Sequence, residues 1–344
     1  MTTYKKSGVD IKAGDSASKI AYSEAKKTFE SRKGLFGKPV KMDGGFAGAL
    51  DFGDFYLIQN CDGVGSKIAV ADAVKKYDTL GYDLLAMVTD DAVCVGAETI
   101  SITNTVDTEK VSAEVIGEMM KGLRKACIEQ KIVIPGGEIA ELPGLVKGNS
   151  WNSTAVGIVE KSKFITGKNV KPGDKIIGLK SAGFRSNGFS LVRHILEKNL
   201  GKSWFKKSYK GKRSWGEQVL TPSKIYSAAL LEILGRYKKE RKVDVKAVVH
   251  VTGGGIPGNI VRILNGKGAR VDNLPEPHEM MLKLMEMGQV SDKEAYKVWN
   301  MGVGMILISS EFEQIRSILS KNGVDSLVIG EVTGQTGIHL TSRG

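Results

Sequence analysis

The sequence predicts an α/β or α+β protein built from two domains. The chain has 344 residues, and strand-like segments ending in glycine-rich turns alternate with stretches of helical periodicity. Its length exceeds that of an ordinary single domain. With 41% hydrophobic and 26% charged residues, the composition excludes a disordered or collagen-like chain. We expect two domains, residues 1–168 and 169–344.

The first half is expected to alternate strands with helices. Strands are predicted over residues 55–60, 100–106 and 132–134, and helices over 68–77, 82–97 and 112–128. The last of these helices has an apolar face opposite a basic one. The polar, lysine-rich segment 166–174 is the best candidate for the domain boundary.

The second half repeats this alternation. Strands are predicted over residues 175–179, 245–251, 300–309 and 326–332, and helices over 189–198, 223–237 and 311–322. Pro222 is expected just inside the start of the second of these helices, where its missing N–H costs nothing.

Composition also limits the functional class. No apolar run approaches the roughly 18 residues of a membrane helix, and the first residues lack an apolar signal segment. Three cysteines without a Cys-x-x-Cys pair and four scattered histidines support neither a disulfide framework nor a zinc site. We therefore expect a cytoplasmic protein without a membrane partner.

The positive charge is concentrated in one stretch. The net charge is +12, and residues 201–246 hold 13 Lys or Arg against 4 Asp or Glu. Such a balance suits an anionic ligand. Aromatic residues among these lysines could stack on single-stranded nucleic acid: Trp204, Phe205, Tyr209 and Trp215. We favour the alternative, a solvated insertion whose lysine stems cover the rings.

Several carboxylates occur where an apolar pattern disfavours them. Asp90 and Asp91 lie in the middle of a helix that is apolar almost all round, Asp62 heads a glycine loop, and Glu138 follows a Gly-Gly pair. Buried anions persist when they are paired, bind a metal or accept several hydrogen bonds. Each alone fits a helix cap or a surface ion pair. Together they favour a magnesium–nucleotide site.

Two glycine loops are candidates for binding phosphate. Lys67 follows Asp62-Gly63-Val64-Gly65-Ser66 as a phosphate-binding lysine would, although the spacing is not that of a P-loop. A helix that starts there would direct free amides at an anion.

The second loop, Gly253 to Gly258, satisfies G-x-G-x-x-G and is followed by Asp272, so NAD binding is an alternative. We favour a turn over a phosphosugar, with Arg262 as its charge partner. His250, just before this loop, is either a proton acceptor or a packed core residue.

A series of motifs carries a resemblance that spans nearly the whole chain. In order, they are Tyr4-Lys5-Lys6-Ser7-Gly8-Val9-Asp10-Ile11, Asp62-Gly63-Val64-Gly65-Ser66-Lys67, Gly136-Gly137-Glu138-Ile139-Ala140-Glu141-Leu142-Pro143-Gly144, Ser186-Asn187-Gly188, Thr221-Pro222, Thr252-Gly253-Gly254-Gly255 and Asn300-Met301-Gly302-Val303-Gly304-Met305. The chain resembles the aminoimidazole ribonucleotide synthetase (PurM) family. The Asp-Gly-Val-Gly loop is shared with selenophosphate synthetase, thiamine monophosphate kinase, HypE and formylglycinamidine ribonucleotide synthetase.

The resemblance implies a homodimer of two-domain chains whose amino-terminal halves build a shared β-barrel. It implies that ATP binds across the dimer region with Mg²⁺, and that the carboxy-terminal domain binds the anionic ribonucleotide and closes over the nucleotide. ATP would phosphorylate the formyl amide oxygen of formylglycinamidine ribonucleotide, and the amidine nitrogen would displace phosphate to close the imidazole ring. We expect no nucleic-acid partner.

Mapped onto this chain, the resemblance assigns site residues. Magnesium would be held by Asp62, Asp91 and Glu138. ATP would contact these three and Gly8, Asp10, Gly63, Val64, Gly65 and Lys67. The ribonucleotide would contact Arg185, Ser186, Asn187, Thr252, Gly253, Gly254 and Asn259. The catalytic candidates are Asp62, Lys67, Asp91 and His250.

Departures from the family pattern leave a second reading open. The family usually has Thr at the position of Cys61, Asn at that of Asp90, His at that of Arg185, and Asp-Tyr at that of Asn104-Thr105. Arg185 is a permanent cation that cannot accept a proton. The alternative is a paralogue that phosphorylates another substrate.

Overall fold

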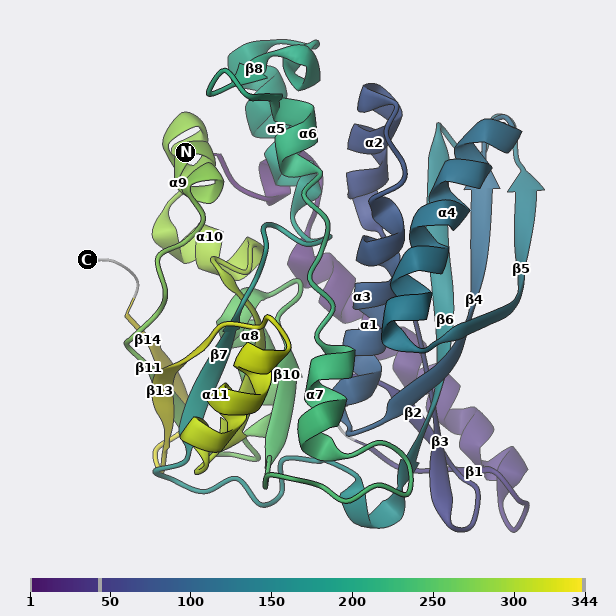
Figure 1. Ribbon diagram of the computed structural model, residues 1–344, viewed down its shortest axis with the longest axis vertical. Helices are drawn as coiled ribbons and strands as arrows, with labels where there is room; N and C mark the ends of the chain where they lie inside the picture. Colours follow the sequence, from purple (N-terminus) through teal and green to yellow (C-terminus); the bar gives the residue numbers. More distant parts are fainter. Residues whose placement is uncertain (1, 43–44, 342–344) are drawn as a thin grey trace.

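The computed structural model describes residues 2–42 and 45–341 and contains two six-stranded mixed sheets, one in each half of the chain (Figure 1). In the order in which they pair, the first sheet contains β1 (Lys38–Pro39), β2 (Gly48–Asp51), β3 (Phe55–Gly63), β6 (Asn149–Glu160), β4 (Glu98–Thr108) and β5 (Val133–Glu141). The second contains β10 (Ala247–His250), β12 (Val303–Ser309), β7 (Lys175–Lys180), β13 (Ser326–Thr333), β11 (Gly268–Val271) and β14 (Gly337–Leu340).

Helices separate the first sheet from the second half of the chain. They are α2 (Ile68–Val74), α3 (Leu80–Cys94) and α4 (Ala113–Gln130), on one side of the sheet in Figure 1. Helix α3 packs against β3 and β6 and also against α7 (Ser227–Leu234) and β10 of the second half. Since almost every residue of α3 is buried, its polar side chains need partners inside the protein.

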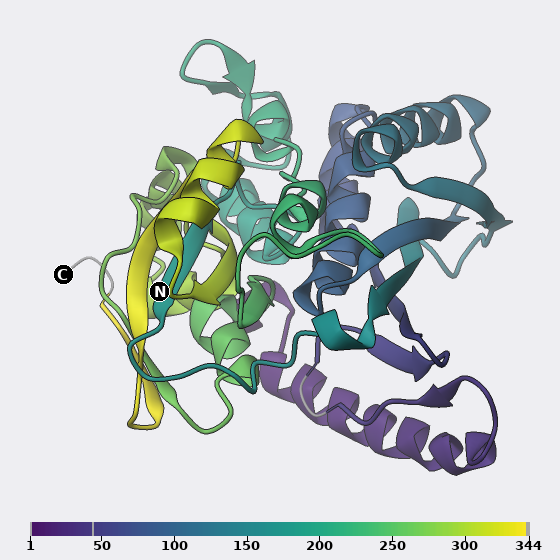
Figure 2. The same cartoon turned by 60° about the horizontal axis from the view of Figure 1, so that its bottom comes forward.

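The remaining long helix of the first half is exposed. Helix α1 (Ile11–Lys27) has no buried residue and forms the long purple helix at the lower edge of Figure 2, outside both sheets. Its start is capped by Asp10, whose Oδ1 accepts the Ala13 N–H at 3.2 Å.

Further helices of the second half pack against the second sheet or against the helices of the first half. They are α5 (Phe189–Leu200), α6 (Trp215–Val219), α8 (Gly255–Ile260), α9 (Glu279–Gly288), α10 (Asp292–Val298) and α11 (Phe312–Lys321). A hairpin of β8 (Ser208–Tyr209) and β9 (Arg213–Ser214) projects beside α5 and α6 (Figure 1).

The hydrophobic core runs through both halves. One cluster joins Leu84 of α3 and Leu123 of α4 to Leu191 of α5 and Met281 of α9, and a second cluster lies around the second sheet. The two halves are therefore packed together over an apolar surface that water does not reach. No helix in the described ranges has both the length and the apolar character needed to cross a bilayer.

The structure agrees with most of the predicted elements, changes the bounds of some and adds others that were not predicted, among them α1 and β6. Strand β5 continues to Glu141, so the Gly136-Gly137 pair lies inside a strand and not in a turn at its end. Helix α7 begins at Ser227 instead of residue 223, because the preceding backbone N–H groups bond to buried carboxylates of α3. Strand β6 was not predicted, since its Asn, Ser, Thr and Gly content hides its alternation.

Candidate functional site

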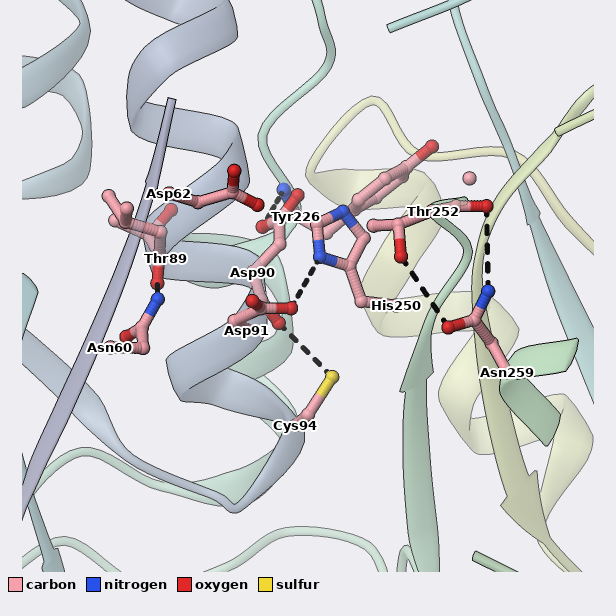
Figure 3. Close-up of polar contacts among 12 residues, drawn as sticks. Asn60, Asp62, Thr89, Asp90, Asp91, Cys94, Tyr226, His250, Thr252 and Asn259 are labelled. Atoms are coloured by element: carbon pink, nitrogen blue, oxygen red, sulfur yellow. Dashed lines mark hydrogen bonds and ion pairs between the residues drawn. The ribbon is translucent and has the colours of Figure 1, made fainter. Parts of the chain in front are cut away.

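Two of the predicted carboxylates meet beside a buried histidine at the junction of the two halves. Asp62 lies near the end of β3, Asp91 lies on α3, and His250 ends β10 (Figure 3). The Oδ1 atom of Asp91 is 2.8 Å from Nδ1 of His250. The side chain of His250 is 0% exposed and that of Asp91 is 17% exposed. The site therefore brings oxygen anions from one half against a ring from the other.

The electrostatics of this group reflect its burial. Burial raises the pKa of Asp91 to about 7, against the opposing attraction of Arg262 and Arg185. Burial also raises the pKa of Asp62 to about 6, helped by the nearby charge of Asp91, while the Gly63 N–H opposes the shift. These two carboxyl groups retain protons more readily than ordinary carboxyls, as expected of groups placed where a bound cation would stabilise their ionised form.

Burial lowers the pKa of His250 to about 3, so its ring is neutral at physiological pH. When Asp91 is ionised, its carboxylate only accepts hydrogen bonds, so Nδ1 then carries the proton and Nε2 keeps its lone pair. That Nε2 atom is buried and has no hydrogen-bond partner among the described residues. A buried acceptor without a partner is costly unless a ligand group completes it.

Glu138 does not join this group within one chain. Glu138 on β5 pairs with Thr105 on β4. The residues just before them, Gly137 and Asn104, lie in one row across the sheet with Ser153 of β6 and Asp62 of β3. Three strand spacings therefore separate Glu138 from the level of Asp62, or roughly 14 Å. No group of three or more possible His, Cys, Asp or Glu metal ligands occurs in residues 2–42 and 45–341. Glu138 instead lies on the exposed edge strand.

Lys67 is held inside the protein. Its Nζ lies 2.8 Å from Oδ1 of Asp83 and donates to the carbonyl of Thr221 at 2.8 Å, with both charged side chains 0% exposed. The same carboxylate accepts the N–H and the hydroxyl of Ser223, at 2.9 and 2.5 Å. The structure thus places Lys67 in a buried ion pair of the first half, which Thr221 and Ser223 of the second half contact.

Arg185 is also paired internally. Its Nη2 lies 2.6 Å from Oδ2 of Asp90, and the two side chains are 1% and 0% exposed. The other carboxylate oxygen of Asp90 accepts the N–H groups of Tyr226 and Ser227, at 2.9 and 3.1 Å, at the start of α7. Asp90 therefore caps a helix of the second half and neutralises Arg185.

The glycine loops have structural reasons for their glycines. A Cβ on Gly63 would lie 2.7 Å from the Trp151 carbonyl oxygen, and Gly65 has φ +57°. A Cβ on Gly255 would lie 1.8 Å from the Tyr296 carbonyl oxygen. Each loop thus needs glycine for close packing or for a left-handed backbone, whether or not it also binds phosphate.

Some of the remaining predicted residues have hydrogen-bond partners for their side chains, and others do not. Asn259 is 2% exposed and donates from Nδ2 to the carbonyls of Gly253 and Gly255, at 3.2 and 2.8 Å, and Thr252 contacts its Oδ1 at 3.4 Å. Ser186 is buried, and its hydroxyl has no partner among the described residues.

The other predicted positions differ in their exposure. Asn187 is half-buried, Val64 is buried in the core, and Gly254 is the left-handed cap of α8 at φ +94°. Gly8 caps a short 3₁₀ helix at φ +95° in the amino-terminal segment.

Asp83 was missed by the sequence reasoning. It lies seven residues before Asp90 and hence on the same face of α3, so both carboxylates contact the segment from Ser223 to Ser227. The available signal was this seven-residue spacing of acids in an otherwise apolar helix.

Two family descriptions match the chain. Residues 44–159 match the AIR synthase related protein N-terminal domain, and residues 171–342 match the C-terminal domain of the same description. The chain is 38% identical over 346 residues to the phosphoribosylformylglycinamidine cyclo-ligase of Thermococcus kodakarensis. It is 39% identical over 345 residues to that of Pyrococcus furiosus, and each match covers 100% of this chain and 99% of the relative.

This chain belongs to the phosphoribosylformylglycinamidine cyclo-ligase family. It is a ligase of purine biosynthesis and an ATP-dependent member of the PurM family. The membership extends over the full chain, so it includes both halves of the candidate site.

Solved structures share the cyclo-ligase fold at low sequence identity. The thiamine-monophosphate kinase of Stenotrophomonas maltophilia matches with a TM-score of 0.58 at 16% identity, covering 91% of this chain and 94% of that chain. HypE of E. coli matches with a TM-score of 0.60 at 15% identity, covering 83% and 82%. Strand order removes the NAD alternative, since β12, β7 and β13 separate β10 from β11, so the strands on either side of the loop are not neighbours in the sheet as a dinucleotide-binding βαβ unit requires.

Proposed function

We propose that the chain closes the imidazole ring of formylglycinamidine ribonucleotide at the expense of ATP, at the junction where Asp62, Asp91 and His250 meet. ATP phosphorylates the formyl amide oxygen. The amidine nitrogen then attacks the carbon that bears this oxygen, and phosphate leaves with the oxygen. The observation that carries this proposal is a pair of half-buried carboxylates of the first half beside His250 of the second, where Asp91 contacts Nδ1 and Nε2 has no partner among the described residues.

Asp62 and Asp91 fit the role of magnesium ligands. Their carboxylate oxygens are the hard donors that Mg²⁺ prefers, and their raised pKa values mark a site that favours added positive charge. When bound, Mg²⁺ would neutralise charge on the ATP phosphates. The carboxylates would hold it and orient the triphosphate.

A homodimer would complete the site. Glu138 lies on the edge strand β5, separated from Asp62 within its own chain. We propose that the amino-terminal halves of two copies form a shared β-barrel and that Glu138 of each copy serves the ATP site of the other. The amino-terminal segment with Gly8 and Asp10 and the loops at Asn187 and Gly253 would close over the ligands.

His250 would accept a hydrogen bond from the substrate. Its neutral ring offers the Nε2 lone pair in a dry site, while Asp91 fixes the opposite nitrogen as the donor. Because its pKa is lowered, the neutral His250 ring would accept a hydrogen bond from an amidine N–H and orient that group. The ring would take up the proton only as positive charge develops on the amidine nitrogen. Ser186, with its free buried hydroxyl, would add a second contact.

The test is direct. The purified protein is incubated with formylglycinamidine ribonucleotide, ATP and Mg²⁺, and ADP and aminoimidazole ribonucleotide are measured together. We expect equal amounts of both products. ADP formation with other amides or phosphate acceptors, in the absence of the imidazole product, would instead favour the paralogue alternative raised by the departures at Cys61 and Arg185.

A further inference from the structure

The ion pair between Asp90 and Arg185 occupies an unusual place in this fold. It is buried, with 2.6 Å between Oδ2 and Nη2, and it links α3 of the first half to the loop before α5 in the second. The guanidinium also donates to the Gly304 carbonyl at 3.3 Å and lies 5.0 Å from the centre of the Tyr226 ring. Arg185 is thus fixed by three separate contacts.

The backbone at Arg185 is held in a strained form. Its φ is +61°, in the left-handed region that only glycine adopts freely. For another residue this conformation is unfavourable and persists where the surroundings enforce it. The side-chain contacts of Arg185 therefore set the course of the chain into Ser186.

Each member of the pair is the immediate neighbour of a candidate site residue. Asp90 precedes Asp91 on α3, and anchoring the Asp90 carboxylate fixes the rotation of the helix that directs Asp91 to His250. Arg185 precedes Ser186, whose buried hydroxyl has no partner among the described residues. One ion pair therefore controls the relative placement of groups from both halves.

We propose that Asp90 and Arg185 are positioning residues, which hold Asp91 and Ser186 in the arrangement that the reaction needs. This inference rests on the proposed function at that site. Arg185 is 2% exposed, and its two Nη atoms contact Gly304 and Asp90, while its buried Nε has no partner among the described residues. Because the side chain is buried and held at its end, it acts through its neighbours and not by touching substrate. The resemblance implied that Arg185 contacts the ribonucleotide. We instead assign it the role of supporting Ser186.

A purely structural ion pair would affect stability alone. The Arg236–Glu98 pair provides the control, because it also joins the two halves, at 2.6 Å, and neither residue adjoins a candidate site residue. The variants are Arg185→Gln, Arg185→Lys, Asp90→Asn, the double variant Asp90→Asn/Arg185→Gln, and Glu98→Gln. Stability is measured by urea unfolding, and turnover is normalised to folded protein.

We expect Arg185→Gln to lower kcat about ten- to hundred-fold, as misplacement of reacting groups does, and to destabilise the fold. Asp90→Asn in the same chain should restore stability, because no unpaired buried charge remains, while kcat stays low. Arg185→Lys should give intermediate kcat, since it keeps the charge but not the planar fork. Glu98→Gln should lose stability and keep its kcat.

Wild-type kcat in folded Arg185→Gln, or in the double variant, would overturn the positioning role. Calorimetric binding of ATP with Mg²⁺ supplies a readout that needs no turnover. A wild-type protein that binds ATP with Mg²⁺ but forms no imidazole product contradicts the proposed function alone. In that case, weaker ATP binding in the double variant than in Glu98→Gln would still support positioning, and equal binding would reject it.

Discussion

Asp91 and His250 contact each other across the two halves, with 2.8 Å between Oδ1 and Nδ1. When Asp91 is ionised, the contact fixes the tautomer of the ring and leaves Nε2 as a buried acceptor without a partner among the described residues. It also keeps a carboxyl with a pKa of about 7 in a dry environment. Such an arrangement is unfavourable for folding alone, which is the usual mark of a functional site.

Replacing Asp91 with Asn is expected to abolish turnover without weakening the fold. The pKa of Asp91 is raised to about 7 in the folded protein, against about 3.9 in an unfolded chain. The folded state thus binds the proton more tightly, and stability decreases as pH rises from about 4 to above 7. In metal-free buffer at pH 8, Asp91→Asn should be more stable than wild type by on the order of 1 kcal/mol. Urea unfolding at pH 5 and 8 measures this, and a clear loss of stability at pH 8 contradicts it.

The demand for magnesium should rise as the pH falls. Protonation competes with metal binding at Asp62 and Asp91, whose pKa values are about 6 and about 7. The Mg²⁺ concentration that gives half-maximal ADP formation should therefore be several-fold higher at pH 6 than at pH 8. Excess chelator should stop the reaction at either pH. An equal magnesium requirement at both values would argue against these two carboxylates as ligands.

Two inactive variants should restore activity when mixed, provided that the ATP site is shared between copies. Glu138→Ala and Asp91→Ala would each be inactive alone, whereas a mixed dimer has one site with neither substitution. Co-expression with two affinity tags isolates the mixed dimer, and ADP formation is measured. A mixed dimer as inactive as its parents would place Glu138 outside the partner's site.

Substitution of Lys67 should act mainly on stability. Lys67→Met leaves Asp83 buried and unpaired, and breaking a buried ion pair in this way costs about 3 to 5 kcal/mol. Removing the second charge in Lys67→Met/Asp83→Asn should recover much of that loss. Urea unfolding of both variants tests this expectation. If Lys67→Met keeps wild-type stability and yet loses turnover, the lysine acts on phosphate, as its spacing after the glycine loop predicted.

The basic stretch should contribute neither to turnover nor to nucleic-acid binding. Trp204 and Trp215 are buried, so the rings that might stack on bases instead pack into the core. Replacing the exposed Lys206, Lys207 and Lys212 with Gln should leave kcat unchanged. RNA binding measured at low and high salt should be weak; a steep salt dependence with tight binding would revive the nucleic-acid alternative.

The sequence predicted the nature of the site better than its geometry. Asp91 could be recognised because a carboxylate in an apolar helix needs a special reason, and that reasoning depends only on local pattern. The partners of Asp90 and Lys67 could not be predicted in the same way. Arg185 lies 95 positions from Asp90, and Asp83 occupies the first turn of α3, where acidic residues are ordinary.

Glu138 shows a second limit. The Gly136-Gly137 pair indicated a turn, which would have placed the carboxylate at a strand end among the others. Pairing with β4 instead keeps these glycines extended, and Gly137 packs so closely that a Cβ would lie 2.6 Å from the Asn104 carbonyl oxygen. Strand register is a tertiary property, and a single sequence does not specify it.

The core that unites α3 and α4 with α5 and α9 also affects how the chain tolerates a break in its backbone. A nick in the connecting segment at residues 166–174 would leave two fragments still joined by this apolar seam, by the hydrogen bonds of Ser223 to Asp83 and by the Asp90–Arg185 ion pair. The halves would thus behave as one cooperative unit, and either fragment made alone would expose its share of the seam and aggregate.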